Sequence, residues 1–186
     1  GEALIAFTRG RPLSAGAWLG MLVLKPQALV LLVPGLALAR QWRVLAGMGA
    51  GVVALGLVTA AVDPDWVPGY VAQVVALAGA DGQAMAAFPT SMSNWRAFGL
   101  NASRVIPGDL AWALAAAGMA ATAAAGLACA RRLAGNGRRQ EGVAWLGLTA
   151  AGCAFTWHAH VHMSLLLVPP LYLVLAERPA LRPLAE

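Results

Sequence analysis

A single lysine interrupts a long apolar stretch near the start of the chain, in the triplet Lys25-Pro26-Gln27. Placing a lysine in the middle of a membrane costs about 2.5–3.5 kcal/mol on insertion scales, so such residues usually face a cavity, a partner or a ligand. Pro26 lacks an N–H group and restricts the residue before it, which favours a break in the helix. We therefore expect two short helices that meet at an apex, where Lys25 and Gln27 bind a phosphate or diphosphate. A lysine that reaches the membrane surface from a helix end is the alternative.

All three histidines of the chain lie together, at His158, His160 and His162. In a helix the first and third would share a face, whereas in an extended segment all three would point the same way. A zinc site would need a further carboxylate or cysteine, and none is adjacent. We therefore expect no metal and favour hydrogen bonds from the histidines to a sugar or phosphate. A histidine cluster without a binding role is the alternative.

A third group of polar side chains lies in the one long polar connection of the chain, residues 63–107. It contains Asn94, Trp95 and Arg96, which could line a substrate groove with the Trp95 ring stacked on a sugar. A tryptophan that anchors the chain at the membrane surface would look the same in sequence. Connections of this length are usually functional.

Two carboxylates, Asp63 and Asp65, are candidates for a general base, because glycosyl transfer requires deprotonation of an acceptor hydroxyl. They flank Pro64 at the end of an apolar run, and that arrangement is also typical of a turn. The turn is the interpretation we favour.

The composition indicates an integral membrane protein. Of the 186 residues, 60% are hydrophobic and only 11% are charged, against about 25% charged in a soluble domain; the mean hydropathy is +0.68. The net charge of +5 comes from arginines clustered between apolar runs, as the positive-inside rule produces, so we expect no nucleic-acid binding. Cys129 and Cys153 lie within apolar runs and are expected to be small buried side chains, not a disulfide or metal pair.

The apolar runs predict an all-α, multi-pass transmembrane protein with one domain over residues 1–186. Two runs, 44–62 and 110–129, are long enough to cross a bilayer. Because most of the 13 basic residues lie between runs that would share one side, we expect them in the cytoplasm and residues 63–107 in an extracytoplasmic loop. The expected location is the inner (plasma) membrane, with membrane lipids as neighbours.

Two pairs of shorter apolar runs accompany the long ones: 14–39, divided at Lys25, and 143–157 with 163–176. At about 1.5 Å per residue each arm reaches roughly 20 Å, short of a hydrocarbon core about 30 Å thick. We therefore expect broken or re-entrant helix pairs. A single kinked span over residues 14–39 is the alternative.

Several of these stretches resemble the integral-membrane glycosyltransferases of family 87. The similarity is carried by residues 18–27 with the Lys-Pro-Gln triplet, by the junction 40–43 and the glycine-rich run after it, by residues 91–99, which resemble the outer loop of the family, and by residues 158–170, which resemble its histidine-containing turn. The resemblance spans roughly residues 9–176. One departure is Met163, where the family often has an acidic residue after the turn.

The resemblance implies a GT-C fold and transfer of a hexose, mannose in the polyprenyl-phosphate-mannose-dependent mannosyltransferases of mycobacteria. The donor would be a polyprenyl-phosphate sugar and the acceptor a lipid or glycan at the extracytoplasmic face; no cofactor is implied. Lys25 and the histidines would hold the donor phosphate. The catalytic aspartate of GT-C enzymes lies in the first outer loop, so we expect the general base upstream of residue 1 and this chain to be the inactive C-terminal part of a longer enzyme. A transporter or flippase, or a non-catalytic membrane assembly subunit, is the alternative.

Overall fold

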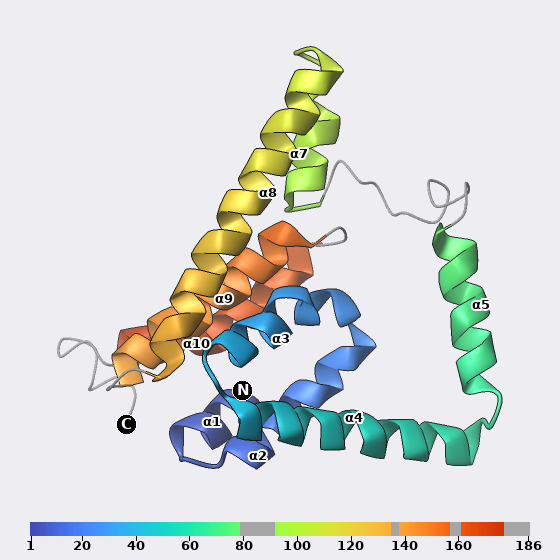
Figure 1. Cartoon of the computed structure of the whole chain (residues 1–186), viewed down its shortest axis with the longest axis vertical. Helices are drawn as coiled ribbons and strands as arrows, with labels where there is room; N and C mark the ends of the chain where they lie inside the picture. Colours follow the sequence, from blue (N-terminus) through green and yellow to red (C-terminus); the bar gives the residue numbers. More distant parts are fainter. Residues whose placement is uncertain (79–91, 135–137, 157–160, 177–186) are drawn as a thin grey trace.

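The computed structural model describes residues 1–78, 92–134, 138–156 and 161–176, and all regular secondary structure within them is helical (Figure 1). The elements, with η marking a 3₁₀-helix, are α1 (Glu2–Thr8), α2 (Pro12–Gly20), η1 (Met21–Leu24), η2 (Pro26–Ala28), α3 (Leu29–Leu38), α4 (Trp42–Val62), α5 (Trp66–Ala78), α7 (Trp95–Ala102), α8 (Gly108–Ala130), η4 (Arg131–Ala134), α9 (Arg138–Phe155), η5 (Val161–Leu167) and α10 (Val168–Ala176). The all-α prediction is confirmed. The two long apolar runs correspond to α4 and α8, each long and apolar enough to cross a membrane.

The predicted break at Lys25 is confirmed. Helix α2 tightens into η1 and stops, because Lys25 adopts φ −133° and ψ 71°, outside the helical region. Pro26 then occupies the first position of η2, where its missing N–H group would have had no helical partner. Residues 14–39 thus form two short arms and not one kinked span.

The second short pair is also present, with different boundaries. Helix α9 begins at Arg138, earlier than the predicted residue 143, because the polar residues before the apolar run continue the helix. The partner arm starts as the 3₁₀-helix η5 and becomes α-helical only at Val168. The connection 63–107 contains two helices in its described parts, α5 and α7.

Glycines allow α2 and α4 to run side by side with their backbones in contact. Helix α2 supplies Gly16 and Gly20, and α4 supplies Gly47 and Gly51, each pair four residues apart. A methyl group on Gly51 would lie 2.6 Å from the carbonyl oxygen of Ala17. This is the small-xxx-small packing of membrane helices, in which the absence of side chains permits close approach. The contacts follow the same order along both helices, so α2 and α4 are parallel.

Two shorter helices cover successive parts of α8. The antiparallel helix α9 packs on its C-terminal half, where Gly126 meets Ala151, and α7 packs on its N-terminal half, where Gly118 meets the ring of Trp95. Helix α9 therefore reaches only about halfway along α8 (Figure 1). This is the short arm that the sequence predicts.

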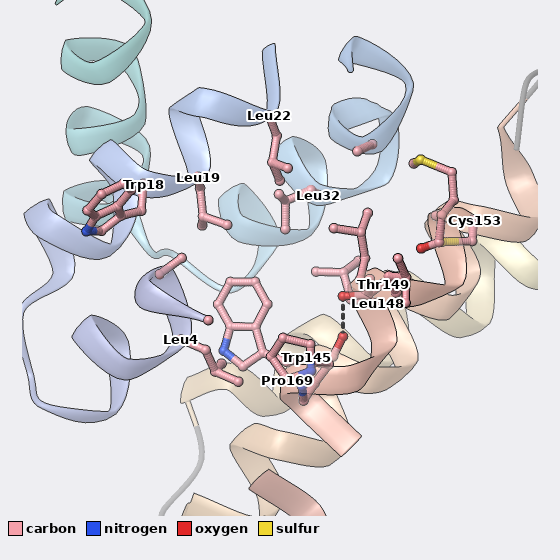
Figure 2. Close-up of a pocket in the computed structure, with 18 of the residues that line it drawn as sticks. Leu4, Trp18, Leu19, Leu22, Leu32, Trp145, Leu148, Thr149, Cys153 and Pro169 are labelled. Atoms are coloured by element: carbon pink, nitrogen blue, oxygen red, sulfur yellow. Dashed lines mark hydrogen bonds between the residues drawn. The ribbon is translucent and has the colours of Figure 1, made fainter. Parts of the chain in front are cut away.

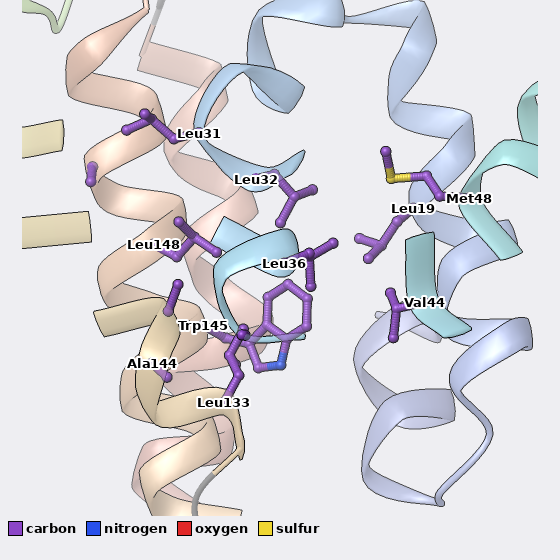
Figure 3. Close-up of a cluster of buried hydrophobic side chains, with 13 residues drawn as sticks. Leu19, Leu31, Leu32, Leu36, Val44, Met48, Leu133, Ala144, Trp145 and Leu148 are labelled. Atoms are coloured by element: carbon purple, nitrogen blue, oxygen red, sulfur yellow. The ribbon is translucent and has the colours of Figure 1, made fainter. Parts of the chain in front are cut away.

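The core joins the first short pair to α8 and α9 (Figure 3). Its largest fully buried side chains are Leu36 of α3, Val44 of α4 and Leu148 of α9. Helix α4 leaves this core, and its far half is exposed up to Val62. Such an exposed apolar surface is expected of a helix that contacts lipid.

A substitution pair tests the glycine contact. A methyl group on Gly47 would overlap the carbonyl group of Leu13, whereas one on Gly49, in the same helix, would meet no atom within 4 Å. We expect Gly47→Ala to lower the free energy of unfolding by about 1–3 kcal/mol. Gly49→Ala should leave it unchanged or raise it by up to about 1 kcal/mol. Unfolding of the protein from mild detergent micelles by added denaturing detergent measures both values, and equal effects would contradict the packing.

Candidate functional site

A cavity of about 450 Å³ lies between the two short-helix pairs (Figure 2). One wall comes from α1, α2 and the segments around the Lys25 break, and the other from α9, η5 and α10. Apolar side chains dominate the lining, and Glu2 is its one acidic residue among the described parts of the chain. Such a cavity can hold an apolar chain but offers few groups that could transfer protons.

The cavity lies against the Lys25 break without including the lysine. Leu22 and Ala28, each three residues from Lys25, line it, while Lys25 itself is exposed and outside the lining. Met163 of η5 lines the opposite wall, and η2 contacts α9. The fold therefore brings the end of the first broken pair next to the end of the second.

The predicted roles of Gln27 and the histidines stay predictions. Gln27 belongs to η2 and His162 to η5 by their backbones, but their side chains lie outside the described part of the structure. His158 and His160 lie outside the described residues altogether. The absence of a metal is also untested at these positions; within the described residues, no three His, Cys, Asp or Glu side chains gather in a way that could hold a metal ion.

Residues on both sides of the histidine segment are held in place by hydrogen bonds. Cys153 donates its thiol to the carbonyl oxygen of Met163 at 3.6 Å, and Thr156 donates its hydroxyl to the carbonyl oxygen of Cys153 at 3.3 Å. Thr156 and Met163 are each only 3% exposed. Thr156 and Met163 are thus fixed in position, and Met163 lines the cavity together with Cys153.

Asn94 joins α7 to the end of α9. Its side-chain oxygen accepts the backbone N–H group of Ala97 at 2.9 Å and so caps α7. Its side-chain nitrogen donates to the carbonyl oxygen of Thr156 at 2.9 Å, and the residue is only 8% exposed. Both the oxygen and the nitrogen of the Asn94 side-chain amide therefore have structural roles. The predicted contact of Asn94 with substrate stays a prediction.

Trp95 packs against α8. Its indole nitrogen donates to the hydroxyl of Thr122 at 2.8 Å, and its ring meets the ring of Phe98 edge to face, with centroids 5.7 Å apart. Arg96, the next residue of α7, is half-buried. The structure thus places both on the helix that Asn94 caps, and their predicted contacts with a sugar are not tested by it.

A comparison with protein families supplies the identity. The model of glycosyltransferase family 87 matches residues 2–170, nearly the whole chain. The chain belongs to glycosyltransferase family 87. No curated protein and no solved structure matches it. Membership confirms the predicted family and implies a glycosyltransferase associated with a membrane.

In a glycosyltransferase, the positions of Asp63 and Asp65 bear on whether either could act as the general base. Asp63 accepts the backbone N–H group of Asp65 at 3.1 Å, and its carbonyl oxygen accepts the N–H group of Trp66 at 3.2 Å. The two residues form the turn between α4 and α5, and neither lines the cavity. The geometry agrees with the turn that we favoured.

Sequence reasoning missed the face of α9 that lines the cavity of this family 87 protein. Trp145, Thr149 and Gly152 line it and follow the i, i+4, i+7 spacing of one helix face, which was the available signal. Thr149 donates its hydroxyl to the carbonyl oxygen of Trp145 at 2.7 Å, so it contributes little polarity (Figure 2). Trp145 is 5% exposed and packs edge to face on Phe7, with ring centroids 5.3 Å apart.

Asn94→Asp tests the junction between α7 and α9. Aspartate keeps the oxygen that caps α7, but it loses the N–H donor and places a charge against the Thr156 carbonyl group. We expect the free energy of unfolding to fall by about 1–3 kcal/mol, the usual effect of an unsatisfied buried polar group. The control is Ser103→Ala at the other end of α7, where an exposed hydroxyl bonds locally to the carbonyl group of Leu100 and the expected change is within about 0.5 kcal/mol. An Asn94→Asp protein as stable as the control would show that the junction is not needed.

Proposed function

We propose that this family 87 protein takes part in transfer of a hexose, specifically mannose, from a polyprenyl-phosphate donor to a lipid or glycan acceptor at the extracytoplasmic face of the plasma membrane. The observation that supports this proposal best is the apolar cavity between the two broken pairs. Its walls include residues on both sides of Lys25 and the residue that follows His162.

A polyprenyl-phosphate has an apolar part and a charged part, and the structure offers an apolar cavity with an exposed cation, Lys25, next to it. An isoprenoid chain is apolar, and each Å² of apolar surface that it buries contributes about 25 cal/mol. A phosphate is anionic and suits the compact charge of an ammonium group. In the proposal the isoprenoid chain of the donor occupies the cavity, and its phosphate lies outside the cavity against the exposed Lys25.

The remaining predicted residues complete the proposed site. Gln27 and the three histidines hydrogen-bond the phosphate or the sugar, and the Trp95 and Arg96 segment of α7 faces the sugar and acceptor. The Asn94 junction supports this grouping, because it holds the start of α7 against the residue that precedes the histidine segment. These residues bind and position substrates; the acid–base step is not assigned to them.

The proposed orientation is that of a multi-pass, GT-C-like membrane protein with its arginine-rich turns in the cytoplasm and residues 63–107 outside. Single cysteines test it in a background without Cys129 and Cys153. We expect Val105→Cys, at a position 85% exposed, to react in intact cells with a maleimide that does not cross membranes. Arg132→Cys should react only after the cells are opened. The reverse pattern would overturn the orientation and with it the extracytoplasmic reaction.

Lys25→Met tests the proposed phosphate contact. Hydrogen bonds to charged groups contribute roughly 1.5–3 kcal/mol, so we expect donor affinity or turnover to fall by about 10- to 150-fold. Lys25→Arg should retain only part of the donor affinity or turnover, because a planar guanidinium differs from a point charge. Assays at varied donor concentration measure the effect.

The matched control is Arg104→Met, which removes an exposed cation at the turn between α7 and α8. It should leave donor affinity unchanged. The yield of folded protein should be the same for all three variants, because each altered residue is exposed. A Lys25→Met enzyme with full donor affinity and activity would remove Lys25 from the site.

A further inference from the structure

Two turns near the start of the chain share one backbone geometry but differ in the residue at its critical position. After α1, Gly10 adopts φ +68°, and the N–H group of Arg11 bonds to the carbonyl oxygen of Ala6 at 2.9 Å. After α3, Arg40 adopts φ +55°, and the N–H group of Gln41 bonds to the carbonyl oxygen of Leu36 at 2.9 Å. Both are Schellman motifs, in which a left-handed residue closes the helix.

Glycine is the usual residue at this position, because a side chain there crowds the backbone. Arg40 is the one non-glycine residue with positive φ among the described residues. The chain thus keeps a cation where glycine would be less strained. Strain that persists at one position is a reason to ask what the side chain does there.

The fold gathers further arginines around Arg40. A methyl group on Gly35 of α3 would lie 3.2 Å from the side chain of Ala130, the last residue of α8, so the turn after α3 that contains Arg40 lies near the end of α8. Helices α2 and α4 start side by side, with Gly47 against Leu13, so their preceding arginines share that end. The turns lie close together in Figure 1. Six exposed arginines form what we call the arginine face: Arg9, Arg11, Arg40, Arg43, Arg131 and Arg132.

The surroundings of the arginine face combine charge with exposed apolar side chains. Leu13, Leu38 and Trp42 are 57%, 47% and 61% exposed beside it. Glu141, in the first turn of α9, is one acidic residue at this end, and it is half-buried with an interaction of its own. The exposed Glu2 is another, in the first turn of α1, since the N-terminus lies beside the start of α4 (Figure 1). Arginine next to exposed tryptophan and leucine is the composition of a surface at the level of lipid headgroups.

We propose that the arginine face binds the phosphate-bearing headgroups of anionic membrane lipids. Clusters of basic residues next to membrane helices attract such lipids, and the guanidinium fork binds phosphate through two parallel hydrogen bonds. The positive-inside rule explains cations at this end but places no demand on backbone geometry. Arg40 in a left-handed turn is explained by a ligand that its side chain must reach. This site differs from the proposed donor site, since Lys25 lies at the opposite end of α2 and α3.

The test uses the purified chain in neutral detergent micelles, with its unfolding temperature as the readout. Phosphatidylglycerol should raise this temperature by roughly 5–10 °C at about 100-fold excess over its dissociation constant. Phosphatidylcholine, which carries no net charge, should leave it nearly unchanged. High salt should reduce the effect of phosphatidylglycerol, because it screens exposed charges.

Two variants separate lipid binding from folding. Arg40→Gly relieves the left-handed strain, so it should raise the unfolding temperature in detergent alone by about 2–4 °C and lower the additional rise from phosphatidylglycerol. Arg131→Gln with Arg132→Gln should remove most of that rise. Arg104→Gln, an exposed arginine elsewhere, should keep all of it.

Three results would overturn the proposal. They are equal stabilisation by phosphatidylcholine, equal stabilisation by inorganic phosphate, and an undiminished effect of phosphatidylglycerol on both arginine variants. Because the readout is lipid-dependent stability and not sugar transfer, each outcome is independent of the Lys25 experiment.

Discussion

The structure depends on satisfying backbone groups where short helices end inside an apolar protein. A helix end leaves carbonyl groups without partners, and in an apolar environment each such group costs several kcal/mol. Helix α9 ends beside the middle of α8, and Asn94 donates to the carbonyl oxygen of Thr156 there. Close by, the Cys153 thiol donates to the carbonyl oxygen of Met163. These contacts allow α9 to stop at mid-length and α7 to continue along α8 in its place.

Short helices in turn create the cavity. Because the first pair breaks at Lys25 and the second after Phe155, their ends meet and leave space between α1–α2 and α9–α10. Close backbone contact through Gly16 and Gly47 keeps α2 in place against α4. Leu22 and Ala28, on either side of Lys25, and Met163 of η5 thereby line the same apolar cavity, and the proposed binding of an amphiphilic donor rests on this arrangement.

The two proposed sites use cations differently, for a physical reason. Lys25 is a single ammonium group at the end of a broken helix, suited to one phosphate as a point charge. The arginine face spreads several guanidinium groups over three turns, beside exposed leucines and a tryptophan. A surface of this kind suits many headgroups at a membrane interface. Since Lys25 and the arginine face lie at opposite ends of α2 and α3, a substitution at one site need not alter binding at the other.

The sequence alone determined the features that depend on local chemistry or on length. Pro26 lacks an N–H group and restricts Lys25, so the break there could be predicted, although Pro34 lies inside α3 without ending it. Uninterrupted apolar length predicted α4 and α8. Only the tertiary structure decided which distant groups meet. Asn94 bonds to Thr156, 62 residues away, and Trp95 packs on Gly118, so residues that resembled a binding segment prove also to hold two helices together. Such pairings follow from how helices pack, because any apolar face can bury itself against several others, and composition does not distinguish among them.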